Sequence, residues 1–295
     1  MGIKSGLLDI YENHYKTLML ITFVLLFIST GYLGYRYAKT GDFIEKGISL
    51  RGGITFTAQT TNIDVDALTL FLTTEFPKSD ITVRVLTELG QVSNVVIEAT
   101  NADEKQMIDA LRKYGMDLQE GTYTAEFIGS SLGDSFFKQT MIALIFAFVA
   151  MSIVVFITFR NPVPSSFVIL AAVSDVISTL AVVSFMGIKL GTTGIAGFLM
   201  LIGYSVDTDI LLTTRVLRRK EGSIFQRTMS ALPTGMLMSI TSFAAVTVSY
   251  FLTESDAIKQ IMLILSIGLL FDILYTWIQN AGILRWYLEK KNGNK

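Results

Sequence analysis

Cysteine is absent from this 295-residue chain, and histidine occurs only once, as His14. The lack of cysteine excludes disulfides, thiolate metal sites and a cysteine nucleophile. A lone histidine near the N-terminus gives little support to a histidine-based metal site or a Ser-His-Asp triad. The phosphate-binding pattern G-x-x-x-x-G-K-[ST] is also missing, so ATP hydrolysis has no visible site. We therefore expect no enzyme activity, no metal and no cofactor.

Charged residues are scarce as well, at 17% of the chain against 51% hydrophobic residues. Because a soluble domain carries about 25% charged residues, this deficit indicates a membrane protein. Six apolar runs have the length of roughly 20 residues that a helix needs to cross a bilayer. They are Thr17–Tyr37, Phe136–Phe159, Val163–Gly187, Leu190–Thr214, Met229–Leu252 and Ala257–Leu284. The first run has no A-x-A-like cleavage site and five more follow it, so we expect a retained helix rather than a signal peptide.

Lysine and arginine gather on one side of these spans. The connection after the fourth span and the C-terminal tail hold Arg215, Arg218, Arg219, Lys220, Arg227, Arg285, Lys290, Lys291 and Lys295. The short loops on the other side hold only Lys189 and Lys259. Because positively charged loops stay in the cytoplasm, we expect both termini to be cytoplasmic. The region between the first and second spans then lies outside the plasma membrane.

This outer region, 41–135, is the only long polar segment, with 7 Lys and Arg against 15 Asp and Glu. Alternating patterns predict strands, and amphipathic patterns after Asp64 and before Gly115 predict helices. In chain order the predicted elements are Gly47–Gln59, Val65–Phe76, Ile81–Glu88, Asn94–Ala99, Asp103–Tyr114 and Thr122–Ile128. The order β-α-β-β-α-β is that of a ferredoxin-like fold.

The fold class that we predict is therefore an α-helical polytopic membrane protein. It has six transmembrane helices and one external α+β ferredoxin-like domain between helices 1 and 2. Its parts are an N-terminal segment with the first helix (1–40), the external domain (41–135), a five-helix bundle (136–285) and a basic cytoplasmic tail (286–295). The acidic outer domain argues against binding nucleic acid. Its charge serves either solubility or contact with an extended or basic polypeptide.

Four aspartates lie inside the spans: Asp175, Asp207, Asp209 and Asp272. A charge at membrane depth costs roughly 2.5–3.5 kcal/mol by insertion scales, so such residues are kept mainly for function. Two helical residues rotate about 200°, so Asp207 and Asp209 point nearly opposite ways. Arg215 follows Asp207 by eight residues, within about 80° of it but about 12 Å along the axis, so the two cannot pair directly.

Two hypotheses remain open for these acids. A carboxylate removed from water favours its neutral form, so it can bind and release a proton in step with a conformational change. Alternatively, each acid only hydrogen-bonds a neighbouring helix, and for Asp272 we keep both readings. Arg215 supplies a fixed positive charge to a relay or anchors the span at the cytoplasmic side. Between the paired acids, we assign Asp207 to the relay and Asp209 to helix packing.

Small and hydroxylated residues mark the fourth and fifth spans. Small residues at helical spacing let membrane helices approach closely, and this predicts packing roles for Gly191, Gly194, Gly197 and Gly203. The fifth span offers the hydroxyls of Thr234, Ser239, Thr241 and Ser242. These either pack helices together or line a hydrated path beside the acids, and we keep Thr241 and Ser242 as relay candidates.

Three segments resemble the SecF family of protein-export membrane proteins, in its archaeal form. Gly47–Gly53 resembles the motif that opens the external domain, carried by Gly47, Leu50, Arg51, Gly52 and Gly53. Phe159–Ser165 looks like the loop after the second span. Gly203–Asp209 is similar to the fourth-span signature, with Asp-Thr-Asp where the bacterial form has Asn-Asp-Thr. The arrangement of one span, an external domain and five further spans is also that of this family.

The resemblance implies a non-enzymatic partner of SecD within the resistance-nodulation-division superfamily. Such a subunit associates with the Sec channel in the lipid bilayer and draws preproteins outward with the proton gradient. It marks Asp175 as the third-span acid and Arg215 as the arginine that ends the fourth-span motif. Three alternatives are a small-molecule exporter of the same superfamily, a SecD-like subunit and a purely structural partner. Exporters usually carry twice as many spans, and SecD carries a much larger external domain.

Overall fold

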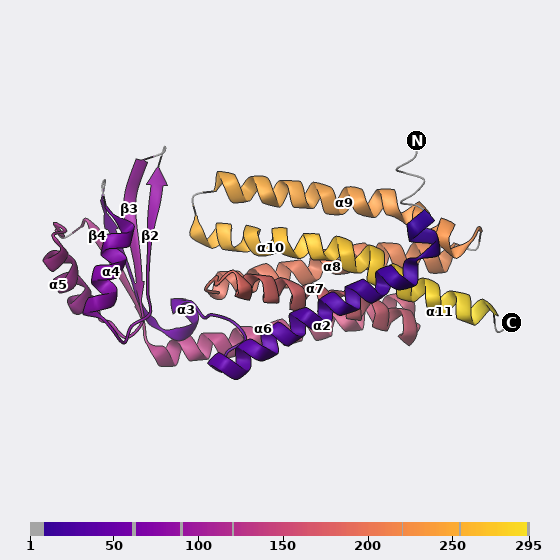
Figure 1. Cartoon of the computed structure of the whole chain (residues 1–295), viewed down its shortest axis with the longest axis horizontal. Coiled ribbons are helices and arrows are strands. Elements are labelled where there is room, and N and C mark those ends of the chain that lie inside the picture. Colours follow the sequence, from indigo (N-terminus) through magenta and orange to yellow (C-terminus); the bar gives the residue numbers. More distant parts are fainter. Residues whose placement is uncertain are drawn as a thin grey trace.

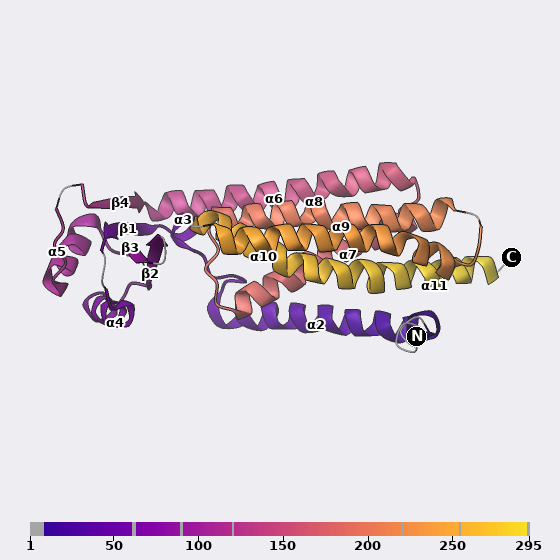
Figure 2. The same cartoon turned by 90° about the horizontal axis from the view of Figure 1, so that it is seen from above.

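The computed structural model describes residues 9–60, 63–88, 91–119, 121–219, 221–253 and 255–293. A small sheet domain stands at one end of an elongated bundle of helices (Figure 1). The first and last described residues both lie at the opposite end of the bundle, as the view from above also shows (Figure 2).

Six helices in the described part of the chain are long and apolar enough to cross a membrane, which confirms the predicted number. Five of them are α2 (Tyr15–Thr40), α6 (Ser130–Phe159), α7 (Pro162–Phe185), α8 (Thr192–Arg218) and α9 (Ile224–Leu252). The sixth span is built from α10 (Asp256–Leu274), a π-helical segment η1 (Tyr275–Asn280) and α11 (Ala281–Gly293). Helix α6 begins six residues before the predicted apolar run, because its polar first turns reach into the sheet domain.

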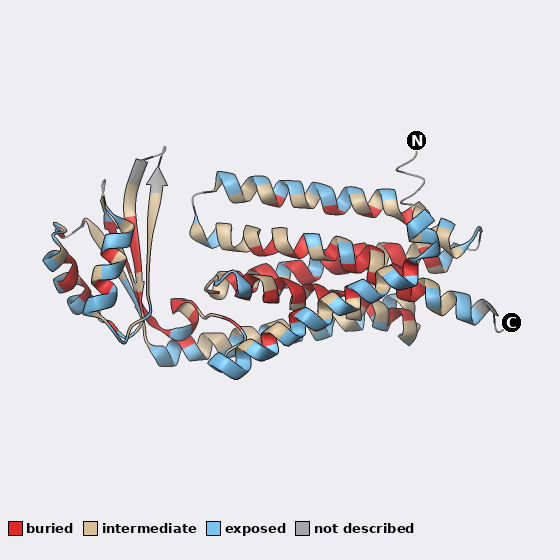
Figure 3. Ribbon diagram, in the orientation of Figure 1, coloured by how far each residue is buried: buried red, intermediate tan, exposed pale blue. Residues whose placement is uncertain are grey.

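The spans differ in how deeply they are buried. Helices α7, α8 and the sixth span form the centre of the bundle, whereas α2, α6 and α9 expose most of their surface (Figure 3). In a bilayer those exposed apolar faces meet lipid. Asp175, Asp209 and Asp272 of these central helices are buried inside protein, which is where membrane proteins keep ionisable side chains.

The sheet domain contains a four-stranded antiparallel sheet with the strand order β2-β3-β1-β4. Its elements are α3 (Ile48–Arg51), β1 (Gly53–Gln59), α4 (Val65–Glu75), β2 (Ile81–Glu88), β3 (Gln91–Ala99), α5 (Glu104–Tyr114) and β4 (Tyr123–Ile128). Helices α4 and α5 bury Leu68, Leu72 and Leu111 against Phe56 and Ile97 of the sheet. Asp64 caps α4 and Gly115 ends α5, at the boundaries that the sequence indicated.

The first predicted strand, Gly47–Gln59, is wrong in its opening half. Residues Ile48–Arg51 form the short helix α3, which buries Leu50 completely, and the strand begins only at Gly53. Gly52 and Gly53 make the bend with φ angles of 86° and 140°. A Cβ at Gly52 would lie 2.6 Å from the Ser130 Cα, so the motif fits tightly against the start of α6.

We expect Gly52→Ala to destabilise the chain, because the left-handed conformation alone costs a non-glycine residue about 1–3 kcal/mol and the clash adds to it. Gly115→Ala is the comparison, since Gly115 also has a positive φ, of 102°, but lies in the left-handed helical region with open space around the added Cβ. The midpoint of thermal unfolding of the purified chain should fall further for Gly52→Ala. Equal shifts would show that the contact with α6 contributes nothing.

Glycines of α8 let α10 approach closely. A Cβ at Gly194 would lie 2.9 Å from Gln260 Oε1, and one at Gly197 would lie 3.4 Å from the Ile261 Cα. Gly191 stands at the N-terminus of α8, where a Cβ would lie 2.9 Å from Ser49 Oγ. Gly203 differs from the prediction, because it is exposed and a Cβ there would meet no atom within 4 Å. Within this chain Gly203 makes no helix contact.

Candidate functional site

Three carboxylates share the centre of the bundle. Asp175 comes from α7, Asp209 from α8 and Asp272 from α10, and each residue is fully buried. Ser205, one turn before Asp209 on α8, bonds Asp175, and Asp209 and Asp272 both bond side chains of η1. The structure thus brings together three of the four aspartates that the sequence marks. We call these three residues the acid cluster.

Each member of the acid cluster accepts a hydrogen bond from a neighbour. Ser205 Oγ donates to Asp175 Oδ2, and Asn280 Nδ2 donates to Asp209 Oδ1 over 2.7 Å. Two hydroxyls serve Asp272, Thr276 Oγ1 at 3.1 Å and Ser239 Oγ at 3.3 Å. The donors come from α8, α9 and η1, so the cluster ties the central helices to one another.

The acid cluster is nevertheless incompletely paired. Asp175 Oδ1 and Asp209 Oδ2 are buried oxygens without a hydrogen-bond partner, as are the Asn280 Oδ1 and the Thr179 hydroxyl beside them. No lysine or arginine forms an ion pair with the cluster in the described part of the chain. An uncompensated buried charge costs several kcal/mol, so gain or loss of a proton here changes the energy with which the three helices hold together.

Among the described residues, no group of three or more His, Cys, Asp or Glu is arranged to hold a metal ion. The carboxylates of the acid cluster can bind protons and accept hydrogen bonds. Their hydrogen bonds link side chains on different helices. A change of protonation would therefore act on helix packing.

The π-helical segment η1 shapes this centre. A π-helix widens the turn by one residue and occurs mostly as single turns, frequently at functional sites. Its Tyr275 hydroxyl lies 2.6 Å from the Ser178 Oγ of α7, and its Thr276 and Asn280 bind the acids directly. Sequence reasoning missed these residues. The available signal was a run of polar side chains, including Gln279, inside an apolar span.

The structure places the two fourth-span acids in opposite surroundings, and their roles stay a prediction. Asp207, which the sequence led us to assign to the relay, is exposed, whereas Asp209 lies in the acid cluster. Their opposite facing follows from the 200° rotation, but rotation alone does not say which side is inward. Ser205 lies four residues before Asp209 and donates to Asp175 of α7. Ser205 and Asp209 therefore share the face of α8 that points into the bundle.

Arg215 is separate from the acid cluster. Its guanidinium donates to the Ser230 carbonyl at 2.9 Å and to Thr234 Oγ1 at 3.4 Å, both on α9. Thr241 is exposed and bonds the Leu237 carbonyl of its own helix at 2.7 Å, so neither residue contacts the acids. Of the fifth-span hydroxyls, Ser239 is the one that reaches them.

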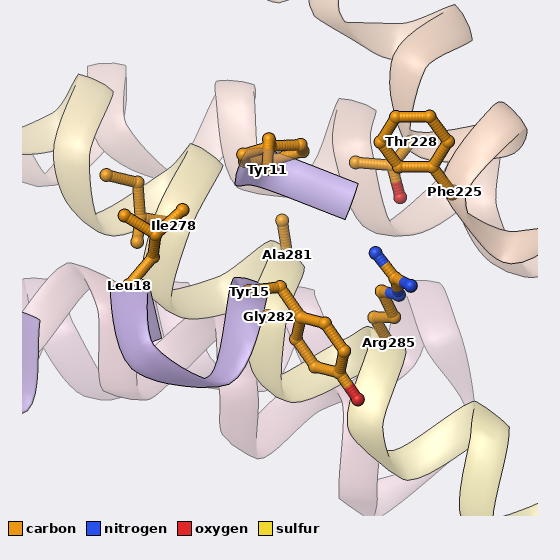
Figure 4. A pocket seen from close by; sticks show the side chains of 9 residues that line it. All are labelled: Tyr11, Tyr15, Leu18, Phe225, Thr228, Ile278, Ala281, Gly282 and Arg285. Carbon is orange, nitrogen blue, oxygen red and sulfur yellow. The ribbon is translucent and has the colours of Figure 1, made fainter. Parts of the chain in front are cut away.

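The N-terminal segment contacts the sixth span at η1 and α11. The Tyr11 hydroxyl donates to the Trp277 carbonyl of η1 over 2.5 Å, and burial raises the pKa of Tyr11, which keeps it a donor. Arg285 stacks its guanidinium 4.2 Å from the Tyr15 ring centroid. A small cavity of about 10 Å³ lies between these groups (Figure 4), close to the minimum for one water. It is too small for a ligand.

Six spanning helices, an antiparallel sheet domain at one end and acids buried among the central helices define a multi-pass membrane protein with titratable groups in its bundle. Residues 106–290 match the family model "Protein export membrane protein SecD/SecF, C-terminal". The chain belongs to the SecF family of protein-export membrane proteins. It is accordingly an auxiliary subunit of the Sec protein-translocation machinery.

Relatives and solved structures support this membership. The chain is 36% identical to SecF of Pyrococcus furiosus over 294 residues, 99% of this chain and 98% of the relative. It is 35% identical to SecF of Methanocaldococcus jannaschii over 95% and 98% of the two chains. The fold resembles the crystal structure of SecDF, a translocon-associated membrane protein from Thermus thermophilus, with a TM-score of 0.72 and 18% identity. The match covers 93% of this chain but 38% of that one.

Proposed function

We propose that this subunit couples proton binding at the acid cluster to preprotein export through the Sec channel. The observation that carries the proposal is the burial of Asp175, Asp209 and Asp272 among three helices, with unpaired oxygens and no cationic partner in the described part of the chain. Burying three carboxyl groups in a membrane bundle costs free energy, so such residues are kept mainly where their change of charge serves a function. Proton uptake and release would alternate two arrangements of these helices.

The proposed topology places both termini in the cytoplasm and the sheet domain outside the plasma membrane. The support is the excess of lysine and arginine at the end of the bundle where the described termini lie, which the positive-inside rule assigns to the cytoplasm. We also propose that the sheet domain is a ferredoxin-like unit. The support is its element order and its strand order β2-β3-β1-β4. On this side the domain can meet an emerging preprotein.

We propose a SecD-like subunit as the partner. Its support is the solved SecDF chain, because this chain matches only 38% of the length of that protein. An assembly of comparable size therefore needs a second subunit with further spans. The exposed carboxylate of Asp207 on α8 also calls for a polar neighbour at membrane depth. The Sec channel and the translocating preprotein complete the set of proposed partners, with no nucleic acid.

Secretion into inverted membrane vesicles tests the function. Vesicles that contain this subunit should translocate a preprotein faster when a proton gradient is imposed, and an uncoupler should remove the difference. Vesicles from a deletion strain should show the slow rate under both conditions. Co-purification of a SecD-like chain from native membranes checks the partner separately. Equal stimulation with and without the subunit would contradict the proposal.

A further inference from the structure

The connection between α7 and α8, residues Met186–Gly191, lies where the sheet domain meets the bundle (Figure 1). Its backbone pairs with the linker that follows α2. Leu190 N–H donates to the Glu45 carbonyl at 2.7 Å, and Gly47 N–H donates to the Leu190 carbonyl at 2.8 Å. This parallel bridge fastens the loop to the entrance of the sheet domain.

Lys189 connects the same loop to the sheet itself. Its Nζ lies 2.8 Å from Asp80 Oδ1 and donates to Thr82 Oγ1 at 2.7 Å, both at the start of β2. Farther along β2, Arg84 Nη1 lies 3.5 Å from Asp256 Oδ2 in the first turn of α10. The edge strand is thus held to the loop and to α10 by charged side chains.

Gln260 of α10 ties the loop to the central helices. Its Nε2 donates to the Lys189 carbonyl at 2.7 Å, and its Oε1 accepts from Gly191 N–H at 3.3 Å and from Thr193 Oγ1 at 2.9 Å. One amide therefore joins α10, the loop and the first turn of α8. Gly194 is small enough to let that amide sit against α8.

The helices that meet at this loop are those that carry the acid cluster. Helix α7, with Asp175, runs into the loop, and α8, with Asp209, starts from it. Gln260 precedes Asp272 on α10 by twelve residues, about 18 Å along the helix axis. A shift or rotation of any of these helices at the acid cluster must therefore reach Lys189 or Gln260.

The sheet face is not packed on the bundle. An open cleft of about 690 Å³, lined by residues such as Thr57, Glu98 and Glu126 from the sheet and Ile188 from the loop, lies between them. The domain therefore has room to tilt, and contacts at the rim of the cleft decide whether it follows the bundle. Exposed ion pairs are individually weak and can be exchanged during such a movement.

We propose that Met186–Gly191 is a coupling loop that transmits rearrangement of the acid cluster to the sheet domain. Lys189 and Gln260 are its positioning residues. The inference rests on the proposed proton-coupled function and adds the route by which force reaches the domain. The backbone bridge and Gln260 hold the loop to both parts, and Lys189 makes the sheet follow the loop.

Distances between spin labels test the coupling in the full chain, reconstituted in liposomes with its SecD-like partner. The chain has no native cysteine, so introduced pairs are labelled uniquely. Lys105→Cys on α5 with Leu252→Cys on α9 reports the sheet domain against the bundle. Ile145→Cys on α6 with Leu237→Cys on α9 reports the bundle alone, and all four positions are exposed. Asp209→Asn serves as the trigger when both chains are measured at alkaline pH, where the native carboxyl loses its proton and the amide imitates the uncharged acid.

The trigger should shift both distance distributions in an otherwise native chain. With Lys189→Met added, the bundle pair should still shift fully, and the shift of the domain pair should shrink to the part that the Arg84–Asp256 contact carries. Lys189→Arg should restore the domain shift, and Lys259→Met, which removes a charge from the same end of α10, should leave it intact. The retained response of the bundle pair also shows that the variant is folded.

A domain shift that persists at full size in Lys189→Met and in Gln260→Leu would overturn the coupling loop while leaving proton coupling in place. If Asp209→Asn moves neither pair, the proposed function fails and the coupling inference fails with it. The two failures are therefore distinguishable in one set of measurements.

Discussion

Asp209→Asn should reduce proton-gradient-stimulated secretion to the rate seen without a gradient. The substitution preserves the size of the side chain and removes its ability to exchange a proton. Asp209 is fully buried, and no lysine or arginine of the described residues forms an ion pair with it. No neighbouring group therefore compensates for the loss of its proton exchange. The measurement compares secretion rates of inverted vesicles with and without an imposed gradient.

Asp207→Asn is the matched control, since it makes the same chemical change two residues away on the exposed side of α8. Vesicles with this variant should keep their response to the gradient. The reverse pattern, with Asp207→Asn inactive and Asp209→Asn unaffected, would restore the assignment that the sequence alone suggested. Co-purification of the SecD-like partner with both variants shows whether either change disturbs assembly.

Gly235→Ala should destabilise the bundle by about 1–3 kcal/mol, as expected for overpacking of a core. A Cβ at this position of α9 would lie 2.2 Å from Trp277 Cζ2, and the indole is a rigid, buried ring in η1. The clash pushes α9 away from η1 and withdraws Ser239, one turn later, from Asp272. Both the unfolding midpoint of the purified chain and gradient-stimulated secretion should therefore fall.

Gly203→Ala provides the comparison for this prediction. Gly203 also lies inside a spanning helix, but a Cβ there meets open space. Alanine favours a helix over glycine by about 1 kcal/mol, so the purified chain should be unchanged or slightly more stable. Equal losses in both variants would mean that glycine is needed for a reason other than contact between α9 and η1.

The sequence was sufficient for the number of spanning helices in the described residues and for the presence of a sheet domain, because each of these signals is local. Apolar runs of bilayer length predicted all six spanning helices, and Asp64 and Gly115 marked helix boundaries in the sheet domain. The opening of β1 was missed. A Cβ at Gly52 would meet Ser130 at the start of α6, and one at Gly53 would meet Ala99 at the end of β3, and both neighbours lie far away in the sequence.

The acid cluster was only partly predictable. Composition and position identified Asp175, Asp209 and Asp272 as expensive residues in lipid, but which face of α8 points inward depends on the packing of all the helices. The π-helical turn of η1 brings Thr276 and Asn280 to the acids, and no periodicity in the sequence announces a widened turn. Arg215 was expected either to supply a fixed charge to a relay or to anchor the span, and the acceptors of its guanidinium lie on α9.

The glycine-rich motif Gly47–Gly53 lies directly against the coupling loop Met186–Gly191. Gly47 pairs with the α7–α8 loop, Ser49 Oγ accepts from Thr192 N–H at 3.1 Å, and Gly52 packs on α6. The motif therefore joins three spanning helices to the sheet domain within a few residues. Its conformation explains why glycine is required at the bend, independently of any contact with a preprotein.

Proton entry into proteoliposomes tests the central claim most directly. The vesicles contain this subunit, its SecD-like partner and the Sec channel, with a pH-sensitive dye enclosed and a preprotein added outside. Proton movement that depends on preprotein, and that disappears with Asp175→Asn while the complex stays assembled, is the result we predict. Translocation without proton movement, or equal proton movement in Asp175→Asn, would contradict a role of the acid cluster in export.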